Sequence, residues 1–110
     1  EVAEELDAFA AGHVGGWVME GCYGDLIAAV LWRRPVLVWL DVSAEVCSAR
    51  VRTRAYEPHK YATPEAQAAA VDALAAWIAG YASREGDMGR AAHARLFAAY
   101  PGKKRRIAVS

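Results

Sequence analysis

Near the start of the chain, an acidic residue and a glycine end a short apolar run within Trp17–Tyr23. The run Trp17–Glu20 predicts a buried parallel strand, with Glu20 at its carboxyl end, where ligands of α/β proteins bind. Gly21 allows the backbone to turn tightly beside such a ligand. The pattern therefore predicts an acid that orients a substrate or helps to hold a metal. The alternative is a charge that only caps a strand end at the surface.

Three arginines at alternate positions, Arg50, Arg52 and Arg54, lie on a predicted helix after the second strand. Helical spacing places Arg50 and Arg54 on the apolar, core-facing side of that helix. Arginines in such a position need an anionic partner. Either they form ion pairs with Glu20 or Asp41, or they point past the helix end into a phosphate-binding site. Arg52 points elsewhere, toward solvent.

The segment Tyr56–Tyr61 concentrates aromatic, histidine, lysine and proline residues in one loop. This composition is more typical of a binding loop or a mobile lid than of a bare connector. Its polar side chains, His59 and Lys60, are candidate substrate-binding residues. His59 is also a candidate general base, although a single loop histidine more often has no catalytic role.

Four consecutive cations, Lys103–Arg106, follow Pro101 and Gly102. Such a run contacts a nucleotide or a nucleic-acid backbone in some proteins, and in others it is only a solvated surface. The net charge is zero, but residues 1–48 hold eight acids and two bases, whereas the remainder is basic. The basic half either meets an anion or neutralises the acidic half.

The elements expected around these residues alternate between helices and strands. Ser43 and Thr63 are expected helix caps, with Pro64 at the first helical position, and Asp87 is expected to cap the last helix. The four tryptophans are expected in the core. Helices are predicted over residues 1–11, 24–32, 44–54, 64–82 and 88–100, and strands over 17–20, 36–41 and 106–109. The first strand, helix and second strand would form a right-handed βαβ unit.

Length and composition indicate one small domain over residues 1–110, with 55% hydrophobic and 24% charged residues, as in ordinary globular chains. No apolar run is long enough for a membrane helix, so no membrane partner is expected. Two distant cysteines and no signal peptide favour a reducing, cytoplasmic location. Because the sequence begins with Glu1 inside a predicted helix, we expect the chain to lack its natural beginning.

Together, these segments resemble the later part of P-loop small-molecule kinases. The resemblance rests on the Glu20–Tyr23 strand end, the apolar second strand, the arginine-bearing helix, the Glu57–Tyr61 loop, and the late helix segment Ala92–Phe97 followed by the Pro101-Gly102-Lys103 turn. The similarity is to bacterial shikimate-kinase-like and adenylate-kinase-like proteins, and it covers about residues 13–104. It implies a partial three-layer α/β fold, with a short parallel sheet flanked by helices and the first strands missing. The segment 52–63 would belong to a lid.

The resemblance also implies roles for individual residues, with ATP and Mg²⁺ as cofactors of the intact family. Glu20 would hold Mg²⁺ through water, and Gly21 and Tyr23 would line the acceptor pocket. Lid arginines would neutralise the transferring phosphate, with Arg50 and Arg54 catalytic. The remaining positions would bind nucleotide: Arg52, Pro101, Gly102 and Lys103.

The chain departs from that family because it contains no GxxxxGK[ST] phosphate loop. We therefore predict that these residues alone do not transfer phosphate from ATP to a small-molecule acceptor. One alternative is a non-catalytic, kinase-like module that holds an anion or, less readily, nucleic acid through its basic half. Another is an interaction domain whose open sheet edge pairs with a partner, including a second copy of the chain.

Overall fold

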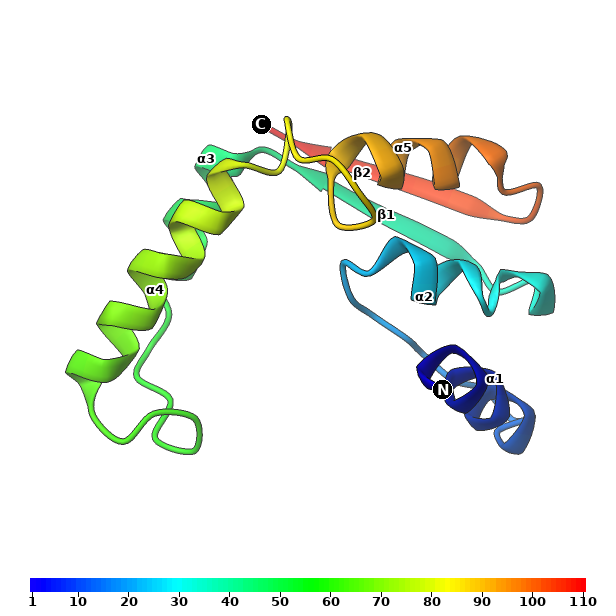
Figure 1. The fold of residues 1–110 in the computed structure, drawn as a ribbon, viewed down its shortest axis with the longest axis horizontal. Coiled ribbons are helices and arrows are strands. Elements are labelled where there is room, and N and C mark those ends of the chain that lie inside the picture. Colours follow the sequence, from blue (N-terminus) through cyan, green and yellow to red (C-terminus); the bar gives the residue numbers. More distant parts are fainter.

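The computed structural model describes all residues, 1–110, as five α-helices and two strands (Figure 1). The chain is mixed α/β, and its sheet is short and parallel. In chain order the elements are α1 (Val2–Gly12), α2 (Gly24–Ala28), a 3₁₀ turn (Leu31–Arg33), β1 (Leu37–Val42), α3 (Ala44–Arg52), α4 (Pro64–Ala79), α5 (Arg90–Ala99) and β2 (Lys104–Val109). No helix has both the length and the apolar character needed to cross a membrane.

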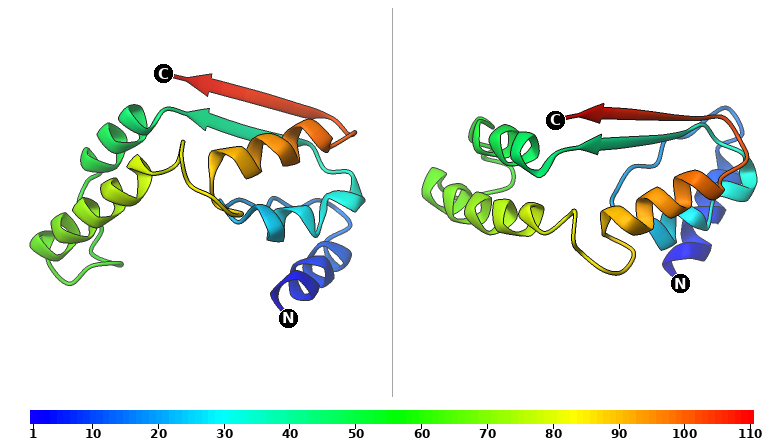
Figure 2. Two further views of the ribbon diagram at one scale, coloured as in Figure 1. Left: turned by 45° about the horizontal axis from the view of Figure 1, so that its top comes forward. Right: turned by 90° about the horizontal axis from the view of Figure 1, so that it is seen from above.

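The sheet consists of β1 and β2, which run parallel and in register from Leu37 opposite Lys104 to Val42 opposite Val109. Their connection passes through α3, α4 and α5, so that α5 returns along one face of the sheet (Figure 2). The other face has no helix over it. Its apolar residues Val38 and Leu40 are consequently 48% and 63% exposed.

The strand predicted over 17–20 is wrong, and with it the βαβ unit built on it. Residues 17–22 form no regular element and no backbone–backbone hydrogen bond. A strand exists only where a neighbour pairs with it, and a single sequence cannot supply that neighbour. The helix predicted from Gly24 also ends early, at Ala28, and a turn leads to the 3₁₀ segment.

Two of the predicted helix starts are confirmed by their caps. The Ser43 hydroxyl accepts from Val46 N, and the Thr63 hydroxyl accepts from Ala66 N. The last helix starts later than predicted, at Arg90, with Gly89 as its N-cap. The carbonyl of Asp87 instead accepts from Gly24 N, which ties the start of α2 to the chain before α5.

Few side chains are buried, and the predicted tryptophan core is wrong in part. Trp32 is 65% exposed and Trp77 is 43% exposed. A two-stranded sheet covered on one face offers little interior surface, so large apolar side chains remain at the surface. The buried apolar residues are Ala10, Val30, Val51, Ala75 and Tyr100. The hairpin formed by α3 and α4 projects away from the sheet (Figure 1).

Candidate functional site

The densest polar cluster lies near the carboxyl end of β1, around Asp41, whose side chain is only 7% exposed. Arg90, the first residue of α5, approaches it with both Nε and a terminal nitrogen, at 3.0 and 2.8 Å. Arg106 donates two further hydrogen bonds from β2, at 2.9 and 2.6 Å. Both guanidinium groups also lie over the ring of Trp39, the neighbouring residue on the same face of β1.

The single carboxylate of this cluster faces two guanidinium groups, so the cluster carries one positive charge in excess. Hydrogen bonds from Arg90 lower the pKa of Asp41, burial opposes this, and hydrogen bonds from Arg106 lower the pKa further. The carboxylate therefore remains ionised at neutral pH and shares its charge between two guanidinium groups. Because its oxygens are occupied, Asp41 serves as a junction of β1, β2 and α5 rather than as a free acid.

A chain of hydrogen bonds continues from Trp39 through Tyr81 to His93. Trp39 Nε1 donates to the Tyr81 hydroxyl at 3.2 Å, and this hydroxyl lies 2.8 Å from His93 Nδ1. His93 Nε2 lies 2.8 Å from the carbonyl oxygen of Cys22, which can only accept. His93 therefore carries a proton on Nε2, and in the neutral imidazole the Tyr81 hydroxyl donates to Nδ1. Burial raises the pKa of Tyr81, so its hydroxyl stays protonated.

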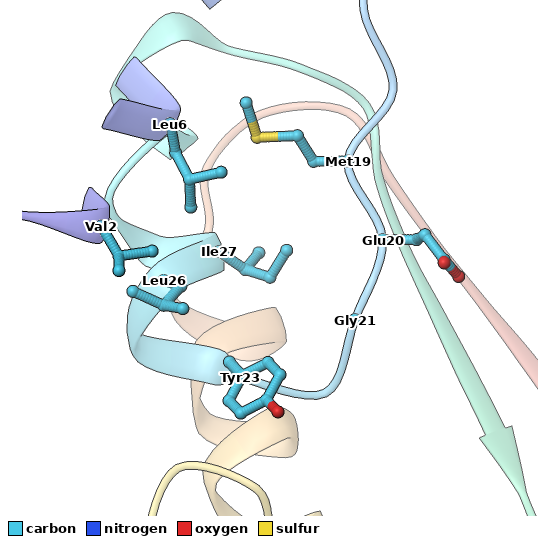
Figure 3. A pocket seen from close by; sticks show the side chains of 8 residues that line it. All are labelled: Val2, Leu6, Met19, Glu20, Gly21, Tyr23, Leu26 and Ile27. Atoms are coloured by element: carbon cyan, nitrogen blue, oxygen red, sulfur yellow. The ribbon is translucent and has the colours of Figure 1, made fainter. Parts of the chain in front are cut away.

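The predicted acceptor residues line an apolar cavity of about 140 Å³ (Figure 3). Gly21 and Tyr23 form one wall, but the carboxylate of Glu20 turns away from the cavity (Figure 3). The lining residues are Val2, Leu6, Met19, Glu20, Gly21, Tyr23, Leu26 and Ile27. The cavity suits an apolar group better than a polar phosphate acceptor.

A resident metal does not fit the side chains around Glu20. No three histidine, cysteine or acidic side chains come together in the structure to hold a metal ion. One carboxylate exposed to solvent is a poor Mg²⁺ site by itself, since Mg²⁺ in proteins is bound through carboxylates together with substrate phosphates. Glu20 thus lacks the surroundings that its predicted role requires.

The predicted nucleotide-binding turn lies at the amino end of the strands, whereas Asp41 lies near their carboxyl end. Pro101 and Gly102 immediately precede β2, so they sit where the parallel strands begin. Pro101 lines an open groove of about 290 Å³ together with Ala28, Leu31, Trp32, Arg34, Leu96, Ala99 and Tyr100. Gly102 packs so closely against the Tyr100 ring that a Cβ would overlap it. Lys103 follows Gly102, directly before β2, and its side chain is exposed.

The arginines of α3 do not face a core, and the prediction that they do is wrong. Arg50 is exposed, and Arg54 lies beyond the helix, which ends at Arg52. Neither forms an ion pair. The reason is that α3 packs on α4 rather than on the sheet, and Val51 supplies its buried side chain. Arg52 pairs with Asp72 of α4 at 2.7 Å.

The predicted lid loop is fastened to α4 by a residue that the sequence did not single out. The side chain of Gln67 is buried, accepts from Glu57 N at 2.7 Å and donates to the carbonyl of Ala55 at 3.1 Å. His59 and Lys60 remain exposed at the tip of the hairpin. The loop is thus held at its base and presents the side chains of His59 and Lys60 to solvent, with Lys60 Nζ 4.0 Å from the Glu57 carboxylate.

The sequence did not predict the contacts of Tyr81, Arg90 and His93, nor the pairing of Arg106, a member of the cation run, with Asp41. Successive residues of a strand point to opposite faces, so a strand that includes both Arg105 and Arg106 places them on opposite faces of the sheet. No local sequence pattern predicts the hydrogen bonds of Tyr81 and His93, because their partners Trp39 and Cys22 are far away in the sequence.

Comparisons of the chain with family models, curated proteins and solved structures find no match.

Proposed function

We propose that the chain is the later part of a kinase-like nucleotide-binding domain, and that it contributes phosphate-binding cations rather than a complete catalytic centre. The observation that carries this proposal is the pair Arg50 and Arg54 on the projecting hairpin. They are exposed and free of carboxylate partners, whereas Arg90 of α5 and Arg106 of β2 are engaged with Asp41. Unpaired guanidinium groups on a projecting element are suited to neutralising phosphate.

The direction of the hairpin supports the same function. The hairpin follows the carboxyl end of β1, and ligands of parallel sheets bind at the carboxyl ends of the strands. Phosphoryl transfer depends on positioned cations that spread the charge of the transferring group. Without a phosphate loop or a metal site, the chain by itself does not transfer phosphate.

The test is a titration of the chain, observed by NMR, with ATP, tripolyphosphate and adenosine. We expect ATP and tripolyphosphate to shift the amide resonances of residues 50–54, and adenosine to leave them unchanged. The double variant Arg50→Ser/Arg54→Ser should weaken tripolyphosphate binding by about tenfold or more, as expected when charge-assisted hydrogen bonds are lost.

The matched control is Lys103→Ser/Arg105→Ser, which removes the same number of unpaired cations from β2 and its approach. It should retain tripolyphosphate binding. Equal losses in both variants would show unspecific charge attraction and overturn the proposal, as would an absence of binding. Phosphate release from ATP by the isolated chain would contradict its predicted inactivity.

A nucleic-acid-binding module is the second candidate, and the cations at the start of β2 favour it. Both Lys103, which precedes β2, and Arg105, which lies opposite Val38 on the uncovered face of the sheet, are exposed and form no ion pair. Binding to a single-stranded oligonucleotide would weaken steeply with salt and would be lost in Lys103→Ser/Arg105→Ser. The first candidate predicts that this variant behaves as the wild type.

A further inference from the structure

The backbone that carries Arg54 has no secondary structure of its own to hold it. Residues 54–56 belong to no helix or strand and form no backbone–backbone hydrogen bond. The chain leaves α3 at Thr53, whose N–H and hydroxyl both donate to the carbonyl of Arg50, at 3.2 and 3.0 Å. Arg50 is therefore fixed by its helix, whereas the position of Arg54 depends on what holds the loop.

Gln67 of α4 holds this loop, because its side-chain amide takes the place of a neighbouring strand. Its Oε1 accepts from Glu57 N at 2.7 Å, and its Nε2 donates to the Ala55 carbonyl at 3.1 Å. In a parallel ladder, one residue offers the same two groups to residues i and i+2 of its partner. Gln67 is only 7% exposed, so solvent has little access to these bonds. They fix the backbone next to Arg54 and leave its guanidinium group exposed.

We propose that Gln67 is a positioning residue for phosphate binding: by holding residues 55–57, it keeps Arg54 at a fixed place relative to Arg50. The inference rests on the proposed function, because it requires that these two arginines bind phosphate groups. A guanidinium group on a free loop must be ordered when the ligand binds, and this loss of entropy weakens binding. In the held loop, the ordering has already occurred on folding.

This role distinguishes between anions of different length. A polyphosphate that contacts Arg50 and Arg54 together gains affinity from their fixed spacing. Inorganic phosphate is shorter, is expected to contact one guanidinium group, and gains nothing from that spacing. Loss of the Gln67 hydrogen bonds should therefore weaken the binding of tripolyphosphate and leave that of inorganic phosphate nearly unchanged. A general disturbance of the hairpin would weaken both.

The first test is Gln67→Leu, which keeps a side chain of similar size and removes both hydrogen bonds. In titrations observed by NMR, tripolyphosphate binding should weaken by about fivefold or more, and binding of inorganic phosphate by less than about twofold. Without any ligand, hydrogen exchange of the Glu57 amide should become faster. The matched control is Tyr56→Phe, which removes a hydrogen bond of the same loop, from the Tyr56 hydroxyl to the Tyr61 carbonyl, and should retain both affinities.

A second variant, Gln67→Glu, separates the hydrogen bonds from the packing. The ionised carboxylate cannot donate to the Ala55 carbonyl, whereas the protonated acid can donate to it and still accept from Glu57 N. Relative to wild type at the same pH, tripolyphosphate binding should be weak at about pH 7.5 and recover at about pH 5, because burial raises the pKa of a carboxyl group. Gln67→Leu should show no recovery.

The comparison with wild type at each pH cancels the titration of His59 and of tripolyphosphate, which both proteins share. Binding of inorganic phosphate by Gln67→Glu measures the plain effect of the added charge. An equal recovery for inorganic phosphate would therefore assign the pH effect to charge and contradict the positioning role.

The outcomes separate this inference from the proposed function. Equal tripolyphosphate affinity of wild type and Gln67→Leu would overturn the inference and leave the proposed function standing. Equal losses for tripolyphosphate and inorganic phosphate in Gln67→Leu, or an equal loss in Tyr56→Phe, would also overturn it. If the wild type bound no tripolyphosphate, the proposed function would fail, and this inference would fail with it.

Discussion

The sheet region and the α3–α4 hairpin are built by different kinds of contact. In the sheet region, Asp41 joins β1, α5 and β2 through four hydrogen bonds from Arg90 and Arg106. In the hairpin, α3 and α4 pack on each other with Val51 and Ala75 buried, and Arg52 and Asp72 form an exposed ion pair. The side chains of that pair are 52% and 72% exposed.

This difference teaches that the number of charges in a region says little about what they do. The predicted catalytic arginines lie in the hairpin, where they remain free, and the unpredicted ones hold the sheet together. A buried carboxylate such as Asp41 depends on its partners and contributes to stability through them, whereas a solvated charge without a partner is available to a ligand. Stability should therefore depend on the sheet network, and ligand binding on the hairpin.

The largest expected effect comes from Asp41→Asn, which leaves two guanidinium groups without their carboxylate. We expect the free energy of unfolding to fall by about 2–3 kcal/mol, because charge-assisted hydrogen bonds at a buried acceptor are lost. Urea denaturation followed by circular dichroism measures this change. A loss below about 0.5 kcal/mol, the scale of ordinary surface substitutions, would contradict the structural role given to Asp41.

The pH dependence of the unfolding free energy should also report on the contact of Asp41 with Arg90 and Arg106. The pKa of Asp41 is lowered from its ordinary value of 3.8, so its stabilising contribution is complete above that value and disappears as the pH falls through the lower pKa of the folded state. The difference in unfolding free energy between wild type and Asp41→Asn should be constant near neutral pH and shrink below about pH 4. Asp7, whose pKa is also lowered, is present in both proteins and cancels in the difference. A difference that grew on acidification would have the wrong sign.

A smaller effect is expected for Tyr81→Phe, which removes the hydroxyl between Trp39 and His93. The loss leaves a part-buried indole N–H and an imidazole nitrogen unpaired, and should lower the free energy of unfolding by about 1–2 kcal/mol. Thermal denaturation at matched pH provides the measurement. Tyr56→Phe, which removes an exposed hydrogen bond in the hairpin loop, is the control and should change stability by less than about 0.5 kcal/mol. If Tyr81→Phe and Tyr56→Phe lowered stability equally, the sheet region would not depend on its polar contacts more than the hairpin does.

The smallest effect should follow Asp72→Asn, the same chemical change as Asp41→Asn made in the hairpin. Exposed ion pairs are worth little, so we expect a change below about 0.5 kcal/mol, and one that vanishes at high salt. Urea midpoints at low and high ionic strength test this. A loss comparable to that of Asp41→Asn would mean that the hairpin depends on its charges as strongly as the sheet does.

The sequence by itself determined the elements whose signals are local. Ser43 and Thr63 cap helix starts through hydrogen bonds to residues three positions later, and Pro64 is the first residue of α4. These helix starts were predicted correctly from the sequence. The apolar strand β1 was also predicted, and so was the later part of β2, residues 106–109, because β-branched residues between breakers favour an extended segment.

The tertiary structure alone decided which charges are engaged and which segments pair. Asp41 meets Arg90 and Arg106 from positions 49 and 65 residues away, and no local pattern distinguishes these arginines from Arg50 or Arg54. Residues 17–20 have the composition of a strand, yet they remain unpaired because pairing requires a neighbour at the right edge. Propensity acts within a few residues, whereas ion pairing and strand pairing are fixed by packing over the whole chain.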